Sequence, residues 1–416
     1  MTIEAKWHED FLGPEFQAAT FALHADSEGM NYTTLIRYMP SLVHDTPQCP
    51  GVPGTSGALV DAPLPKSSYS PNRNTGSFRE TAVSDAPAHE HAHQRPRFAL
   101  IALHGWNDYF YHAHFARYID SIGGLFYALD LRKYGRSWRE GQTWGYIDDL
   151  SAYDDEIHIA LDVIFTEHGP DIPIVLYGHS TGGLTATLWA HRHPGALAGL
   201  ILNSPWLEIQ SASGVRHVST PAVDAMRKVS PRGIIPISDS GIYQRTLNAG
   251  QLDPDAPQPL TSEQRDVLQR AQERTPEDTG DPFFTTGWHT DSRFRHYPSF
   301  PVRAGWMATI LDGHAHVAQG LDVEAPILVL TSTRSTSPSR WNEDALESDT
   351  VLLVEQIWRR APFLGNNVTL AKIPYAIHDV LLSRRSARTH ALDTIHTWLT
   401  AILHTQTEGA QQRRHV

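Results

Sequence analysis

The chain has 416 residues and a formal net charge of −12, so it is long enough for a large core and too acidic for a general binder of nucleic acid or anionic membranes. Its single cysteine, Cys49, excludes an internal disulfide and suits a reducing compartment. No apolar run approaches the ~20 residues that a membrane-spanning helix needs, and the charged residues among positions 1–20 argue against a signal peptide. We therefore expect a soluble cytoplasmic protein without integral membrane association or a nucleic-acid partner.

Two β-prone stretches open the chain. Residues 16–23 and 33–39 flank the turn-forming residues 26–29, so a β-hairpin is predicted. Residues 46–95 are rich in Pro, Gly, Ser and Asn and lack apolar clusters, which predicts a disordered insert whose role the sequence does not reveal. The histidine run at 89–93 could bind a metal, but such a run in a flexible segment is more often only solvated. We therefore expect no metal site at this run.

Short apolar strands and amphipathic helices then alternate, which favours a mostly parallel sheet covered by helices on both faces. The alternation stops at Pro205 and resumes at the apolar run 326–330; the intervening segment is first polar and then rich in aromatic residues. We interpret that segment as a mainly helical cap inserted into an α/β core. The predicted organisation is an N-terminal hairpin at 1–45, the disordered insert at 46–96, the first half of the core at 97–205, the cap at 206–322, the second half of the core at 323–404 and a frayed polar tail at 405–416.

The pentapeptide Gly178-His179-Ser180-Thr181-Gly182 lies between an apolar strand at 172–177 and a helical stretch at 184–193. Glycines at both ends permit a tight strand-to-helix turn, from whose apex the hydroxyl of Ser180 would project. A G-x-S-x-G pattern is common by chance, but this setting makes Ser180 a strong candidate nucleophile.

A serine hydroxyl needs a base to take its proton and an acid to orient that base. On an α/β-hydrolase sheet these follow the serine in the order acid, then histidine. His378 comes just after the predicted strand 368–373, where such a base must lie, and we assign it that role. For the acid we choose Asp349, which precedes a predicted helix at 351–360; Asp344 is the main rival, and the sequence does not decide between them. Weaker alternatives are Glu343 and Glu347.

The negative charge that develops on an attacked carbonyl needs hydrogen-bond donors. The backbone N–H of Thr181, at the start of a helix, can supply one, and the N–H of Trp106, after His104-Gly105 at the end of the strand 98–103, can supply another. The Trp106 side chain is expected to line the substrate pocket, together with Trp288 and Trp306 from the aromatic part of the cap. The plain alternative for each of these tryptophans is an ordinary core residue.

These stretches resemble α/β-hydrolases of the monoacylglycerol lipase and lysophospholipase type, which are grouped with serine aminopeptidases. The resemblance rests on His104-Gly105-Trp106, on residues 130–137, on residues 178–183 and on His378-Asp379-Val380. It covers residues 97–205 and 323–403 and fades in the cap. Two departures stand out: Lys133 replaces the first glycine of the D-x-R-G-x-G-x-S segment, and residues 332–348 separate the candidate acid from its strand. The resemblance implies ester hydrolysis through an acyl-enzyme by a Ser–Asp–His triad, without a metal or cofactor.

We therefore expect a serine carboxylesterase acting on a small-molecule ester with a medium-length acyl or an aryl group, with monoacylglycerol or a lysolipid as candidates. An aminopeptidase or an acyltransferase on the same fold stays open, and cap acids such as Asp253, Asp281 and Asp312 could serve an aminopeptidase. A non-catalytic ligand-binding homologue is the alternative from another class. The natural substrate, the acyl-chain preference and the oligomeric state are not encoded in any pattern that we recognise.

Overall fold

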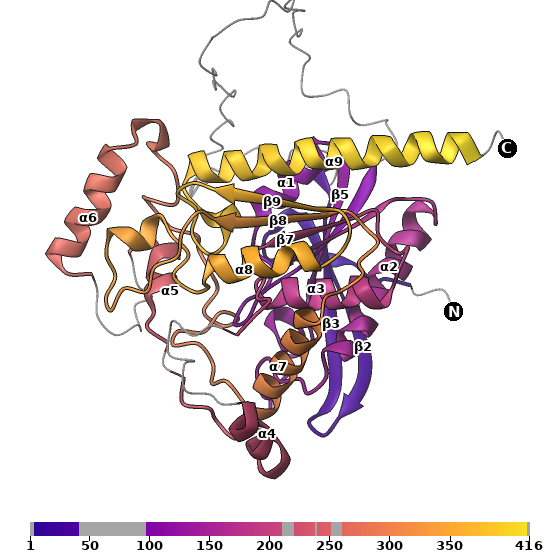
Figure 1. Ribbon diagram of the computed structural model, residues 1–416, viewed down its shortest axis with the longest axis horizontal. Helices are drawn as coiled ribbons and strands as arrows, with labels where there is room; N and C mark the ends of the chain where they lie inside the picture. The colour runs from indigo at the N-terminus through magenta and orange to yellow at the C-terminus, as the bar shows by residue number, and fades with distance from the viewer. Residues whose placement is uncertain (1–3, 41–96, 210–219, 238, 251–259, 414–416) are drawn as a thin grey trace, which may run out of the picture.

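The computed structural model describes residues 4–40, 97–209, 220–237, 239–250 and 260–413, so the predicted insert and its histidine run lie outside the described residues. Within these ranges the chain forms one nine-stranded sheet in the order β1-β2-β3-β5-β4-β6-β7-β8-β9 (Figure 1). Its strands are β1 (His8–Asp10), β2 (Gly13–Asp26), β3 (Gly29–Tyr38), β4 (Phe98–Leu103), β5 (Gly124–Asp130), β6 (Ile174–His179), β7 (Gly199–Asn203), β8 (Ile327–Ser332) and β9 (Val368–Ile373).

The sheet combines an antiparallel edge with a parallel remainder. Strands β2 and β3 pair antiparallel with Phe16 opposite Tyr38, which confirms the predicted hairpin, and β3 pairs antiparallel with β5. From β5 to β9 all neighbouring strands are parallel. The parallel strands therefore end at one common edge, where the loops that follow β4, β6, β7, β8 and β9 meet.

Helices cover both faces of the sheet, as the alternation predicted. Helices α1 (Ala113–Ser121) and α9 (Arg385–Arg413) pack on one face, and α2 (Asp154–His168), α3 (Thr181–Arg192) and α8 (Val354–Arg360) pack on the other (Figure 1). Strand β4 shows why both faces must be covered: Ile101 and Leu103 point into one core, and Phe98 and Leu100 point into the other. A strand with apolar side chains on both sides exposes apolar surface to water unless both faces of the sheet are covered.

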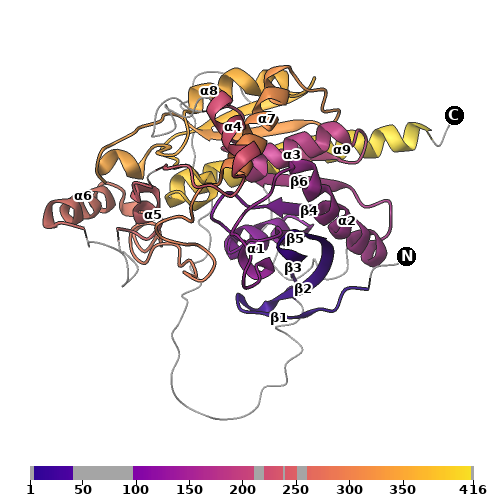
Figure 2. The ribbon, with the colours of Figure 1, turned by 90° about the horizontal axis from the view of Figure 1, so that it is seen from below.

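The described parts of the long segment between β7 and β8 contain α4 (Thr220–Val229), α5 (Ile242–Leu247), α6 (Ser262–Glu273) and α7 (Ala304–Ala318). Helix α7 contacts α3 and α4, and its buried face joins the main core. Figure 2 shows α5 and α6 displaced from this group toward one side of the sheet. That this segment acts as a cap over the site remains a prediction.

The C-terminal helix is longer than expected. Helix α9 continues to Arg413, whereas the sequence predicted its end near residue 403. The residues beyond 404 include Glu, Ala, Gln and Arg, which have good intrinsic helix propensity. Among the described residues, no helix combines the length and the apolar character needed to cross a bilayer.

The segment at 130–137 forms the turn after β5. The buried carboxylate of Asp130 accepts hydrogen bonds from the backbone N–H groups of Phe110 (2.8 Å) and Arg136 (2.9 Å), and the Arg136 guanidinium pairs with it at 2.8 Å. Gly135 has φ +45°, and a side chain there would overlap the Asp130 carboxylate. The segment therefore stabilises the loop after β4 and the turn after β5 as one unit.

Lys133 replaces the glycine of the resembled motif and keeps the left-handed backbone, with φ +63°. Its side chain is fully buried, and Nζ lies 2.6 Å from a carboxylate oxygen of Asp26 and 2.6 Å from one of Glu28, both at the turn of the β2–β3 hairpin. Glu28 also accepts a hydrogen bond from Arg232, which follows α4 (2.8 Å). The ammonium of Lys133 thus links the hairpin, the core and the inserted segment. These ion pairs offset the free-energy cost of the left-handed backbone conformation at this residue.

Candidate active site

Ser180 stands at a strained turn between β6 and α3. Its backbone has φ +54° and ψ −116°, an unusual conformation for a residue with a side chain. A Cβ on Gly178 would lie 2.5 Å from the carbonyl oxygen of Gly182, and a Cβ on Gly182 would overlap the carbonyl oxygen of His104. The two glycines are therefore required by the close approach of the backbones, and the predicted strand–turn–helix geometry is present.

His378 and Asp349 lie together at the same edge of the sheet. The Nδ1 atom of His378 is 2.9 Å from Oδ2 of Asp349, and both side chains are buried. The other carboxylate oxygen of Asp349 accepts hydrogen bonds from the N–H groups of Val351 (2.8 Å) and Leu352 (2.7 Å). With the carboxylate so fixed, Nδ1 carries the proton and Nε2 is left to accept one.

The other candidate acids lie elsewhere. Asp344 pairs with Arg334 at 2.9 Å and has a half-exposed side chain, Glu347 approaches Arg384 at 3.1 Å, and Glu343 pairs with Arg274. Of the four acids considered, Asp349 is therefore the one that contacts His378.

The long excursion between β8 and Asp349 closes on itself. The N–H of Asp349 donates to the carbonyl of Arg334 (3.0 Å), and the N–H of Thr336 donates to the carbonyl of Asp349 (3.0 Å). This bridge returns the chain to the end of β8 after residues 337–348 have looped away. A carboxylate that is distant from its strand in sequence therefore occupies the position next to it in space.

The loop after β4 approaches the serine turn closely. A Cβ on Gly105 would lie 3.1 Å from the Cβ of Ser180, so a larger residue there would crowd the turn. The ring of His104 holds this loop, because Nε2 accepts from the N–H of Leu131 (3.1 Å) and Nδ1 lies 2.8 Å from the carbonyl of Gly105. Trp106 follows directly and lines the same cavity as Ser180, while Thr181 is the first residue of α3.

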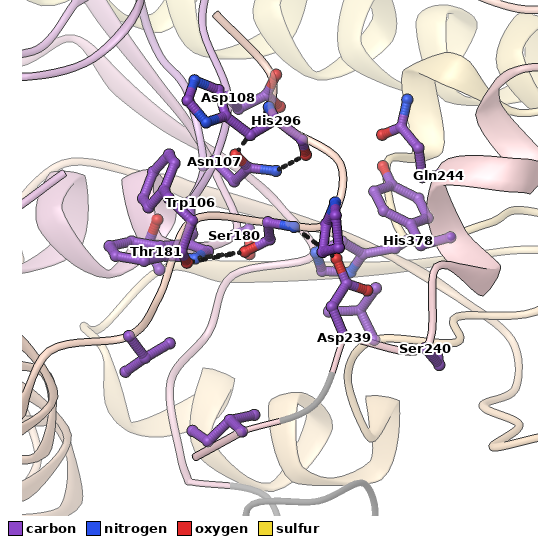
Figure 3. A pocket seen from close by; sticks show the side chains of 18 of the residues that line it. Trp106, Asn107, Asp108, Ser180, Thr181, Asp239, Ser240, Gln244, His296 and His378 are labelled. Carbon is purple, nitrogen blue, oxygen red and sulfur yellow. Dashed lines mark hydrogen bonds between the residues drawn. The ribbon is translucent and has the colours of Figure 1, made fainter. Parts of the chain in front are cut away.

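Ser180, Thr181 and His378 open onto a cavity of about 760 Å³ (Figure 3). One part of its wall is apolar and aromatic: the rings of Trp106 and Trp306 have centroids 3.8 Å apart, and the Phe300 ring lies 4.5 Å from that of Trp106. Further apolar lining comes from Trp206, Ile234, Ile235, Pro236, Ile237, Val302, Met307, Val351 and Leu352. A cavity of this size and character suits a small organic ligand with an apolar portion.

The remaining wall is polar. Asp108 and Arg295 form a buried ion pair at 2.7 Å, and Nε of Arg295 donates to the side chain of Gln244 (2.8 Å). In Figure 3, Asp108, His296 and Gln244 lie on one side of Ser180. Sequence reasoning missed this polar wall, because Arg295 is far from the serine in sequence and only the inserted segment brings it to Asp108.

Trp288, which was predicted to line the pocket, is not among the residues that line this cavity. Its indole N–H donates to the carbonyl of Leu382 (2.6 Å), and its ring packs against His114 at 4.8 Å between centroids. The aromatic part of the inserted segment divides between two clusters: Phe283 and Phe284 join the cluster with Trp288, whereas Trp306 joins the main core. Trp106 and Trp306 do line the cavity. Trp206 also lines it and was not predicted from the sequence, because only the fold places this residue beside the serine turn, where its N–H donates to the carbonyl of Ser180.

His179, next to the nucleophile, is buried and differs from His378 in its partners. Its Nδ1 lies 3.1 Å from the carbonyl of Asn203, and burial lowers its pKa to about 4. A ring with this pKa stays neutral near neutral pH, and its contacts make it a structural neighbour of His378, whose ring lies 4.9 Å away. Within the described ranges, no group of three or more His, Cys, Asp or Glu side chains is arranged to hold a metal ion.

A family model described as serine aminopeptidase, S33, matches residues 94–289. A monoacylglycerol lipase of Mycolicibacterium smegmatis is 29% identical over 138 residues, which cover 33% of this chain and 47% of that protein. Phospholipase YtpA of Bacillus subtilis is 32% identical over 121 residues, covering 28% and 43%, and a monoglyceride lipase of Mus musculus is 25% identical over 163 residues, covering 38% and 50%. The chain therefore spans about half the length of the relatives that it matches.

Among solved structures, a carboxyl esterase from Bacillus coagulans superposes with a TM-score of 0.51 at 13% identity, over 93% of this chain and 99% of that one. A lipase in an open form gives the same TM-score of 0.51 at 16% identity, with the same coverage. Sheet order, serine turn and these likenesses show that the chain has the α/β-hydrolase fold. Within that fold class it is similar to the monoacylglycerol lipases and related serine hydrolases.

Proposed function

We propose that this protein hydrolyses carboxylic esters through an acyl-enzyme, with Ser180 as nucleophile, His378 as base and Asp349 as the acid that orients the base. The observation that carries the proposal is the contact between His378 and Asp349 together with a serine held in a strained strand-to-helix turn, since Ser180 and His378 line one cavity. The relatives named as monoacylglycerol lipases and as a phospholipase support ester chemistry.

In this mechanism, Nε2 of His378 takes the proton of Ser180 as Oγ forms a bond to the ester carbonyl carbon. The backbone N–H groups of Trp106 and Thr181 stabilise the oxyanion, helped by the positive end of α3. The tetrahedral intermediate collapses, the bond to the alcohol breaks, and the alcohol leaves with the proton from His378. Water then attacks the acyl-enzyme, His378 takes its proton, and the acid is released as the proton returns to Ser180.

The cavity supports a proposal for the substrate class. Its aromatic wall at Trp106, Phe300 and Trp306 favours a medium-length acyl chain or an aryl group, because apolar surface is removed from water there. The polar wall at Asp108 and Arg295 favours a leaving group with hydrogen-bonding atoms. Monoacylglycerols and lysolipids combine both features and are the natural substrates that we propose to test.

The aminopeptidase alternative depends on the acids at the cavity. A free substrate amine needs a carboxylate that is available to pair with it. Asp108 is already neutralised by Arg295. Asp239 lines the cavity and accepts hydrogen bonds from the N–H groups of Gly241 (2.8 Å) and Ser299 (3.0 Å), which do not neutralise a carboxylate, so turnover of an aminoacyl p-nitroanilide would favour this alternative. Of the cap acids considered from the sequence, Asp281 bonds Arg388 (3.2 Å) and Asp312 bonds Arg227 (2.8 Å), both away from the cavity wall, and Asp253 lies outside the described residues.

The test is a panel of p-nitrophenyl esters of increasing acyl length, aryl esters, a 1-monoacylglycerol and an aminoacyl p-nitroanilide. Ser180→Ala should abolish ester turnover and covalent labelling by a fluorophosphonate, whereas Ser204→Ala should leave both unchanged. Ser204 is a matched control because it is a buried serine near the turn whose Oγ has no hydrogen-bond partner in the described structure. Full ester turnover by folded Ser180→Ala would refute the mechanism, and wild-type protein that neither turns over esters nor reacts would favour a non-catalytic binding protein. Preferential transfer to an added alcohol would favour an acyltransferase.

A further inference from the structure

Asn203, the last residue of β7, connects the serine turn to the histidine loop. Strand β7 lies between β6, which leads into Ser180, and β8. The backbone carbonyl of Asn203 accepts a hydrogen bond from the N–H of Ser180 (3.1 Å) and lies 3.1 Å from Nδ1 of His179. The backbone of Asn203 therefore belongs to the serine turn.

The side chain of Asn203 reaches the other way, into the loop that carries His378. Its Nδ2 donates to Oδ1 of Asp379 (2.7 Å) and to the hydroxyl of Tyr177 (2.8 Å), and its Oδ1 accepts from the N–H of Val380 (3.1 Å). Asp379 and Val380 are the two residues directly after His378. Asn203 is completely buried, so water does not compete for these bonds.

Asp379 makes this connection a strong one. Burial alone would raise the pKa of its carboxyl group, but the neighbouring His179 and His112 and the hydrogen bonds from His112 (2.8 Å) and Asn203 hold the pKa well below its usual range. The carboxylate is therefore charged, and a hydrogen bond to a buried charge is stronger than one between neutral groups. Its Oδ1 also accepts from the N–H of Leu381 (3.0 Å), which fixes the loop after His378.

We propose that Asn203 is a positioning residue that sets the place of His378 relative to Ser180 by bonding the serine turn through its backbone and the histidine loop through its side chain. This inference rests on the proposed function. Ser180 and His378 come from separate loops, and no covalent geometry fixes the distance between them. A misplacement of about 1 Å between reacting groups can lower a rate by about 10²-fold, so a rigid link at this point matters for turnover.

The experiment compares three variants of the full chain with wild type. Asn203→Leu has a similar size and removes every side-chain bond to the histidine loop. Asn203→Asp keeps the acceptor for the N–H of Val380, but it can donate to Asp379 only when the new pair of carboxyl groups holds a proton. Ser204→Ala is the matched control next in the chain. Thermal unfolding shows which variants fold, and kcat, KM and the rate of fluorophosphonate labelling are measured for each.

Asn203→Leu should lower kcat and the labelling rate by about 10- to 100-fold while KM stays within about twofold, because the cavity wall is untouched. For Asn203→Asp, two adjacent carboxyl groups share one proton more readily as the pH falls, so its kcat relative to wild type should rise from about pH 8 to about pH 6. The titratable groups that face this position are Asp379, His112, His179, Tyr177 and His378, and all of them are also present in the wild-type reference.

A folded Asn203→Leu with kcat within twofold of wild type would overturn the inference. If that variant does not fold, the ratio of the kcat of Asn203→Asp to the wild-type kcat decides. A rise of this ratio toward low pH supports the positioning role, and a flat ratio near one overturns it. Failure of the proposed function has a different signature. In that case Ser180→Ala retains turnover, whereas failure of the positioning role alone leaves Ser180→Ala inactive and the Asn203 variants unimpaired.

Discussion

Asp349→Asn is the substitution that most directly tests the assignment of the acid. The amide can keep its oxygen where Oδ1 accepts from the N–H groups of Val351 and Leu352, so the loop should hold its shape. The amide nitrogen would then face Nδ1 of His378, which is 2.9 Å from Oδ2 in the native protein. Two donors cannot share that contact, so the imidazole proton moves to Nε2, and Nε2 can no longer accept the proton of Ser180.

We expect kcat for a p-nitrophenyl ester to fall by about 10³- to 10⁴-fold, which corresponds to about 4–5.5 kcal/mol of lost transition-state stabilisation, with little change in KM. The assay is steady-state hydrolysis at saturating substrate, with thermal unfolding as the check on folding. Asp344→Asn is the matched control, because the side chain of Asp344 is half-exposed and pairs with Arg334 at the surface; it should stay within about twofold of wild type. The reasoning is refuted if Asp349→Asn retains more than a tenth of the wild-type kcat, or if Asp344→Asn loses as much activity.

Two further predictions concern stability. Burial lowers the pKa of His114 to about 3 and the pKa of His179 and His314 to about 4. Between about pH 4 and 6.5 the unfolded chain therefore binds more protons than the native protein. The contribution of these histidines to the free energy of unfolding is full above about pH 6.5 and is lost as the pH falls. Each histidine should contribute about 1.4 kcal/mol per pH unit in that window, and His314→Gln should reduce the slope by about that amount in urea unfolding at several pH values; an unchanged slope contradicts this. Lys133→Met should lower the free energy of unfolding by about 2 kcal/mol, because Glu28 and its neighbouring carboxylate lose their ammonium partner, while kcat per folded molecule stays constant. A Lys133→Met protein as stable as wild type would show that these buried ion pairs contribute no net stability.

The parts of the site that depend on local chain geometry were predictable. A strand, a glycine-bounded turn and a helix are encoded by neighbouring residues, so the position of Ser180 at the turn follows from its own pentapeptide and flanks. The same holds for Gly105 and Trp106 at the end of β4, and for His378 after β9. Parallel strands place all of these loops at one edge of the sheet, because each strand leads out in the same direction.

Other features depend on contacts between segments that are distant in the chain. Asp349 and Asp344 have similar surroundings in sequence, and only the closure of residues 335–349 brings Asp349 to His378. Trp288 and Trp306 are both aromatic residues of the inserted segment, yet they belong to different clusters. The hydrophobic effect is non-directional, so the sequence does not specify which apolar partner each ring contacts.

The sequence by itself therefore determined the α/β architecture, the serine turn and the histidine, since hydrophobic periodicity and glycine sterics act within a few residues of the chain. Only the tertiary structure decided which carboxylate meets His378, which aromatic rings form the cavity wall, that Asp108 pairs with Arg295, and that Asn203 joins the two loops. Those outcomes depend on how the excursion after β8 and the segment between β7 and β8 fold back on the core, and such long-range packing leaves no periodic trace in the sequence.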